Sequence, residues 1–211
     1  MASANNTPAF DVVALAASAG GLRALSAVLG GLPKGFPVPV LAVQHVDPRH
    51  KSLMAEILQR RTEMTVKEAE AGEHIEAGTV YMAPPNKHLT VAADGVVNLM
   101  MSELVNFVRP SADLLFDSVA FCYRERAISV VLTGSGSDGA MGVKAIKSVG
   151  GTTIAQDEET SEMFSMPNAA IKTGNVDFVL SLDEIAPALI RLILAEESAP
   201  KSKPPGPQKK R

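Results

Sequence analysis

The feature that most constrains the fold of this chain is a pair of apolar strands. Each strand ends in a loop of small residues, and a helix begins directly after that loop. The first unit has an apolar run at 12–15, a turn at 16–21 and a helical run at 22–29. The second has an apolar run at 127–132, a glycine-rich turn at 133–139 and a helical run at 140–149. Strands joined through helices lie parallel in one sheet, so the pattern predicts an α/β domain.

The remaining segments extend the same alternation. Further strands are expected over 38–43, 64–67, 79–83, 152–155 and 177–180, and helices over 53–61, 112–124, 166–173 and 182–195. Asp94-Gly95 between the apolar runs 88–92 and 96–100 is typical of a hairpin turn. We therefore expect a doubly wound, mostly parallel sheet with helices on both faces, to which the β-rich section 64–100 adds an antiparallel hairpin.

Charge is distributed unevenly along the chain. The net charge of −3 includes five basic residues after position 197, so the preceding body carries −8. A body this acidic disfavours nucleic acid as the main partner. The single cysteine, Cys122, excludes an internal disulfide, and the N-terminus has no secretory signal pattern. No apolar run spans a bilayer, so we expect a cytoplasmic protein. Residues 10–196 should form one domain, with disordered segments at 1–9 and 197–211.

Three polar residues follow three apolar strands: Ser18, His45 and Asp138. Function in such folds collects at the carboxyl ends of the strands, so the three side chains are expected at one sheet edge. Serine, histidine and aspartate together suit acyl transfer, with a nucleophile, a general base and an orienting carboxylate. Each residue also has an ordinary alternative: Ser18 and Asp138 as helix N-caps, and His45 as a polar strand end.

The second loop has another interpretation. Gly134, Gly136 and Gly139 match the dinucleotide fingerprint GxGxxG, and Asp157-Glu158 follows the next strand, where a ribose-binding acid is expected. Asp138 inside this loop would repel a pyrophosphate, and the interpretation leaves Ser18 and His45 without a role. A dinucleotide-binding enzyme is therefore the weaker alternative.

A series of motifs in one order resembles a known family. It resembles the catalytic domain of the CheB-type chemotaxis protein-glutamate methylesterases over about residues 10 to 190. The matching segments are Ala17-Ser18-Ala19-Gly20-Gly21, Val43-Gln44-His45, Val66-Lys67-Glu68-Ala69, Tyr81-Met82-Ala83-Pro84, Val105-Asn106 with Arg109-Pro110-Ser111, Leu115-Phe116-Asp117-Ser118-Val119-Ala120, and 132–140.

The resemblance implies hydrolysis of glutamate γ-methyl esters on the cytoplasmic helical domain of chemoreceptors, and some members also deamidate glutamines. It implies Ser18 as nucleophile, His45 as base and Asp138 as the orienting carboxylate. Backbone N–H groups at Ala19 and Ser135 are then candidates for the oxyanion hole. No metal or organic cofactor is implied, and none of the histidines has metal-ligand spacing.

The chain also departs from the family pattern. Ala19 stands where the family usually has threonine, and Ser135 where it often has methionine. Regulated members carry an N-terminal receiver domain, whereas nine residues precede the expected domain here. We therefore expect a chain that is either not regulated by its own phosphorylation or regulated by a separate receiver or kinase protein. A non-catalytic docking module for a signalling partner remains an alternative function.

Overall fold

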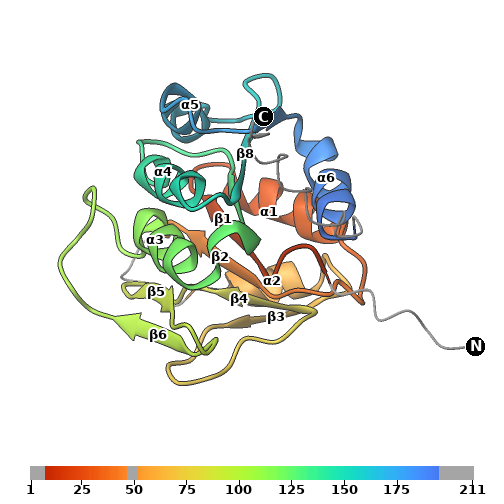
Figure 1. The fold of residues 1–211 in the computed structure, drawn as a ribbon, viewed down its shortest axis with the longest axis vertical. Coiled ribbons are helices and arrows are strands. Elements are labelled where there is room, and N and C mark those ends of the chain that lie inside the picture. The colour runs from red at the N-terminus through yellow and green to blue at the C-terminus, as the bar shows by residue number, and fades with distance from the viewer. Residues whose placement is uncertain (1–7, 47–51, 195–211) are drawn as a thin grey trace, which may run out of the picture.

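The computed structural model describes residues 8–46 and 52–194 (Figure 1). The elements in chain order are β1 (Val12–Ala17), α1 (Gly21–Gly30), β2 (Val40–Gln44), α2 (Met54–Gln59), β3 (Thr65–Glu68), β4 (Thr79–Met82), β5 (His88–Val91), β6 (Val97–Met100), α3 (Ala112–Tyr123), the 3₁₀ turn η1 (Arg124–Arg126), β7 (Ala127–Val131), α4 (Ala140–Ser148), β8 (Thr152–Gln156), α5 (Ser165–Lys172), β9 (Phe178–Leu180) and α6 (Leu182–Leu194). Most of the segments proposed to be disordered, 1–9 and 197–211, lie outside this range. Within it, the Ala9 amide donates to Ile193 O at 3.2 Å.

Seven parallel strands form the main sheet, in the order β3-β4-β2-β1-β7-β8-β9. From β1 the chain first builds the side with β2, β4 and β3, and later returns to place β7 on the other side of β1. The strand order therefore reverses at β1, which makes the carboxyl end of β1 the switch point where α/β sheets bind ligands. The predicted doubly wound sheet is confirmed.

The prediction for the section 64–100 is wrong in part. Strands β3 and β4 do not join the hairpin; they extend the main sheet in parallel, with Val80 in register with Val40 on one side and Val66 on the other. Among the strands of the described residues, only β5 and β6 pair antiparallel with each other, around the turn at Gly95 (φ +81°). Alternating hydrophobicity identifies a strand but carries no information about its direction.

Helices cover both faces of the sheet. One face packs against α1, α2 and α6, and the other against α3, α4, α5 and the β5–β6 hairpin (Figure 1). All six residues of β1 are fully buried, because alternate side chains enter the cores on the two faces. This burial fixes the end of β1 firmly. Of the helices within the described residues, none is long and apolar enough to cross a bilayer.

Candidate active site

Ser18 occupies the turn between β1 and α1. Its amide donates to Thr133 O at 3.0 Å, which ties the end of β1 to the loop after β7. Helix α1 is capped not by Ser18 but by Gly20 in a left-handed conformation (φ +78°), with no side-chain capping bond. The alternative of Ser18 as an N-cap is therefore wrong. Within the described residues its hydroxyl makes no hydrogen bond, so it is available for chemistry.

Close packing around Ser18 requires glycine at Gly134. A Cβ added there would lie 2.2 Å from Met166 Sδ and 2.8 Å from Ser18 Cβ. Both backbone groups of Gly134 form hydrogen bonds around the start of α5. Its amide donates to Met163 O, and its carbonyl accepts from the Met166 amide. The glycine-rich loop after β7 thus supports the Ser18 loop from beside it.

His45 and Asp138 form a direct pair. His45 Nε2 lies 2.9 Å from Asp138 Oδ2, and the side chains are 13% and 3% exposed. The His45 amide donates to Ala17 O at 3.1 Å, which fixes the histidine beside the end of β1. The sheet therefore brings together residues that are 93 positions apart in the sequence.

Asp138 does not cap the helix that follows it, because the N-cap of α4 is Gly139. Its carboxylate instead lies at the N-terminus of α3. Oδ1 accepts from Ser111 Oγ (2.9 Å) and from the Asp113 amide (3.1 Å), and Oδ2 accepts from the Ala112 amide (2.6 Å). The two free amides of the first helical turn and the positive end of the helix dipole both favour an anion there.

These contacts set the charge of Asp138. Burial raises the pKa of this carboxyl, but the hydrogen bonds from His45 and from the Ala112 and Asp113 amides outweigh it and hold the pKa below its usual value. An ionised carboxylate only accepts hydrogen bonds, so His45 Nε2 carries the proton in the pair. In the neutral form of the ring, His45 Nδ1 is then the nitrogen that carries no proton.

A second acid, Asp113, lies beside Asp138 in the first turn of α3. Burial raises the pKa of Asp113, and the charge of Asp138 raises it further, against hydrogen bonds from the Gly142 amide and Asn106 Nδ2 at 2.8 Å each. The two carboxylates thus have opposite pKa shifts at one helix terminus. Asp138 is the one stabilised as an anion and paired with the histidine.

Gln44, the last residue of β2, holds the two site loops together. Its Nε2 donates to Ser18 O (2.8 Å) and to His45 O (2.9 Å), and the side chain is buried. Oε1 has no partner among the described residues and lies so close to Gly21 that a Cβ there would come within 1.8 Å of it. The sequence motif contained Gln44, but nothing in its spacing indicated this bridging role.

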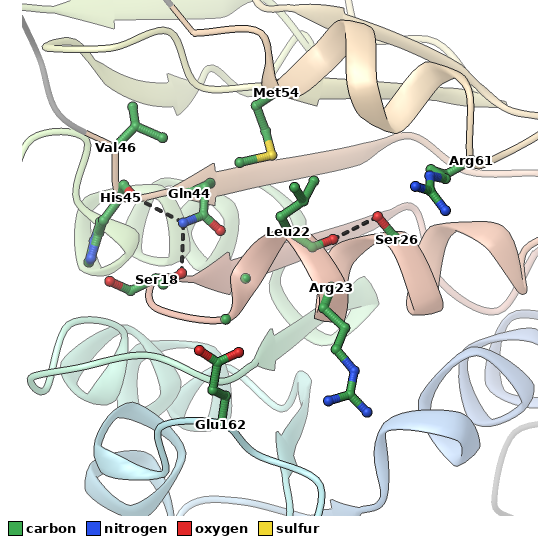
Figure 2. Close-up of a pocket in the computed structure, with 12 residues that line it drawn as sticks. Ser18, Leu22, Arg23, Ser26, Gln44, His45, Val46, Met54, Arg61 and Glu162 are labelled. Carbon is green, nitrogen blue, oxygen red and sulfur yellow. Dashed lines mark hydrogen bonds between the residues drawn. The ribbon is translucent and has the colours of Figure 1, made fainter. Parts of the chain in front are cut away.

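A groove of about 690 Å³ opens over this edge of the sheet. Ser18 and His45 lie together at one end of it, and the outer side of α1 runs along it (Figure 2). Asp138 is behind His45 and does not line the groove. Ala19 is exposed next to Ser18, and its amide makes no hydrogen bond within the described residues. Ser135 is exposed but is not among the residues that line the groove.

The glycine-rich loop at 134–139 makes its side-chain contacts within this site. Asp138, inside the fingerprint, binds His45 and α3, while Asp157 accepts from the Thr160 amide (2.9 Å) and Thr160 Oγ1 (2.6 Å) within its own turn. The acid that would bind a ribose is thus used to close a loop. These contacts leave the dinucleotide alternative without support.

Sequence reasoning missed the residues that hold Asp138 and line the groove. Ser111 is the N-cap residue of α3, but its hydroxyl donates to Asp138 instead of making a capping bond within the helix. Glu162, from the loop before α5, lines the groove beside Ser18. The motif containing Ser111 was the available signal for the first, whereas Glu162 stands in no motif that we singled out.

Comparisons with known proteins identify relatives of this chain. A family model described as CheB methylesterase matches residues 13–189. A Leptospira interrogans relative is 42% identical over 183 residues, covering 87% of this chain and 95% of that protein. A Thermotoga maritima relative, named protein-glutamate methylesterase/protein-glutamine glutaminase, is 41% identical over 86% of this chain and 54% of its own length. The crystal structure of the Thermotoga maritima CheB methylesterase catalytic domain superposes with a TM-score of 0.84 at 41% identity, covering 87% of this chain and 99% of that one. The chain therefore belongs to the CheB methylesterase family.

Proposed function

We propose that residues 10–196 form a catalytic domain that hydrolyses protein glutamate γ-methyl esters with Ser18, His45 and Asp138. The observation that carries this proposal is the 2.9 Å bond between His45 and the buried Asp138, with His45 and Ser18 lining one groove and the Ser18 hydroxyl unbonded within the described residues. Family membership supplies the reaction class, since the Thermotoga relative is named for this esterase activity and for glutamine deamidation.

The contact of His45 with Asp138 supports an assignment of the reacting atoms. Because Nε2 donates to Asp138, Nδ1 is the base that takes the proton from Ser18 Oγ. In the well-known serine protease triad, the two ring nitrogens have the reverse assignment. As Oγ bonds to the ester carbonyl carbon, the imidazole becomes a cation, which the Asp138 carboxylate stabilises.

The steps then follow the usual course of acyl transfer. The tetrahedral intermediate expels the methoxy group, which takes the proton from His45 Nδ1 and leaves as methanol. A water then gives a proton to the same nitrogen and attacks the acyl carbon. The acyl–Oγ bond breaks, Oγ recovers the proton, and glutamate is released. With an amide in place of the ester, the same steps release ammonia from glutamine.

Two backbone regions are proposed as oxyanion donors. The Ala19 amide is exposed beside Ser18 and has no acceptor within the described residues, which supports its assignment. The Ser135 amide likewise has no acceptor there and remains a prediction. One such donor is worth about 3–4 kcal/mol of transition-state stabilisation.

The substrate is proposed to be the methylated cytoplasmic helical domain of a chemoreceptor. The test measures methanol release from a radiolabelled methylated receptor by the wild-type chain and by Ser18→Ala. We expect release by the wild type and a loss of nearly all of it in the variant. Equal release from both would rule out the serine mechanism, and no release from either would favour the docking module.

A further inference from the structure

The groove that leads away from Ser18 has an uneven distribution of charge. Besides His45, its charged lining residues are Glu162 near Ser18, and Arg23 and Arg61 farther along (Figure 2). Arg23 comes from the exposed side of α1, and Arg61 follows α2. In the view of Figure 2 the two arginines extend on either side of α1, and Leu22 and Met54 provide apolar surface nearer to Ser18 than Arg61 is.

Neither arginine is used by the fold. Both are exposed, and neither forms an ion pair or a side-chain hydrogen bond with any of the described residues. By contrast, Arg109 is held by Asn86 Oδ1 at 2.7 and 2.9 Å, and Arg126 by Asp11. The guanidinium groups of Arg23 and Arg61 thus remain available to a ligand that enters the groove.

This pair of cations is opposite in sign to the net charge of the chain. Up to position 197 the chain has 15 basic and 23 acidic residues, a net charge of −8. An arginine forms a planar fork of donors that matches a carboxylate. Glu162 gives the groove a direction, because a carboxylate near Ser18 would be repelled whereas a neutral ester would not.

From this we infer that the groove binds an acidic segment of the substrate protein, in which carboxylates flanking the esterified glutamate pair with Arg23 and Arg61. This inference rests on the proposed function and adds its substrate class. Leu22 and Ser26 are four residues apart on α1, about 6 Å along the axis. The groove therefore spans more than one side chain, so it contacts residues on the flanks of the ester.

The test uses two synthetic peptides that carry one glutamate γ-methyl ester, flanked by glutamates in one and by glutamines in the other. Binding is measured by fluorescence anisotropy on Ser18→Ala full-length chain, so that the peptide is not consumed. Into this background we place Arg23→Gln, Arg61→Gln and both. Arg60→Gln is the matched control, since Arg60 is an exposed neighbour of Arg61 that does not line this groove.

We expect the glutamate-flanked peptide to bind more tightly than the glutamine-flanked one. Each groove variant should raise its Kd about two- to fivefold, as for an exposed ion pair, and the double variant should abolish the preference. Raised salt should weaken the same preference, because exposed charges are screened. The Arg60→Gln protein should keep the preference in full.

Equal binding of the two peptides to the parent, or an equal loss of preference in Arg60→Gln, would overturn the inference. In parallel, methanol release is measured for the wild type and for the Arg23→Gln, Arg61→Gln, double and Arg60→Gln variants that retain Ser18. Release that is lost in Ser18→Ala, combined with a Kd that Arg23 and Arg61 do not affect, would refute the docking inference alone. Absence of release from the wild type would refute the proposed function, whatever the Kd values.

Discussion

His45 and Asp138 meet across β1: the histidine follows β2, the aspartate lies in the loop after β7, and Nε2 is 2.9 Å from Oδ2. The strand between them ends at Ala17, directly before Ser18. One parallel sheet thus brings the three residues to one edge, and the N-terminus of α3 holds the aspartate as an anion. The predictions below test the contributions of these contacts.

Asp138→Asn should retain the fold and lower turnover by about 10⁴-fold, as expected for a triad carboxylate. The amide can donate as well as accept, so it no longer holds the His45 proton on Nε2, and it cannot stabilise the imidazolium. Methanol release per active protein measures the effect, and circular dichroism checks the fold. Turnover within tenfold of the wild type would contradict the assigned role.

The same residue should make stability depend on pH. Because the Asp138 pKa is lowered in the folded state, the unfolded chain binds more protons between that value and about 3.9, and stability rises with pH there. The contribution is present above about pH 4 and lost as pH falls through the folded pKa. Asp113, whose pKa is raised, has the opposite effect: it makes stability fall as the pH rises above about 3.9.

Urea unfolding at pH 7 and pH 3 checks this prediction. The wild type should lose more free energy of unfolding than Asp138→Asn does between the two values, since the variant lacks this titrating group. Equal losses in both proteins would show that Asp138 is not stabilised as an anion in the fold.

Gly134→Ala should impair activity through the position of Ser18. Its Cβ would lie 2.8 Å from Ser18 Cβ and 2.2 Å from Met166 Sδ, so the loops must move apart, at a cost of about 1–3 kcal/mol. Gly35→Ala is the control, because nothing lies within 4 Å of its added Cβ. We expect a large loss of kcat in the first and none in the second; the same kcat in both would mean that the close approach of Gly134 is not needed.

Gln44→Ala should lower kcat more than it raises KM, because it releases the backbone of both Ser18 and His45. Losing two buried hydrogen bonds should also cost about 1–3 kcal/mol of stability. Gln59→Ala is matched to it, since Gln59 also bonds two backbone groups, Met64 O and the Val66 amide, away from Ser18. If both variants reduce kcat equally, the effect of Gln44 is general destabilisation.

The strand ends were predictable from the sequence, and with them the positions of Ser18 and His45. A strand followed directly by a helix places the connecting residue at the carboxyl edge whatever the details of packing. The direction of β3 and β4 was not predictable, because the two-residue period is the same in parallel and antiparallel strands. Their place in the sheet is decided by long-range pairing with β2.

The hydrogen bonds that hold Asp138 could not be predicted from the sequence for a related reason. Ser111 before an apolar helical run is a standard capping signal, and local pattern indicates nothing of a carboxylate 27 residues away that takes over the helix N-terminus. The contacts of Gln44 and Glu162 with the site likewise depend on tertiary packing. Local rules thus gave the proposed catalytic residues, whereas the residues that position them required the structure.

The most direct test of the central claim combines His45→Ala with Asp138→Asn. If Asp138 acts only through His45, adding Asp138→Asn to His45→Ala should leave the residual kcat unchanged, although the same substitution costs the wild type about 10⁴-fold. Methanol release by the wild type, the two single variants and the double variant gives the four rates. A further loss in the double variant as large as that of Asp138→Asn alone would show that the two residues act independently and would contradict the account.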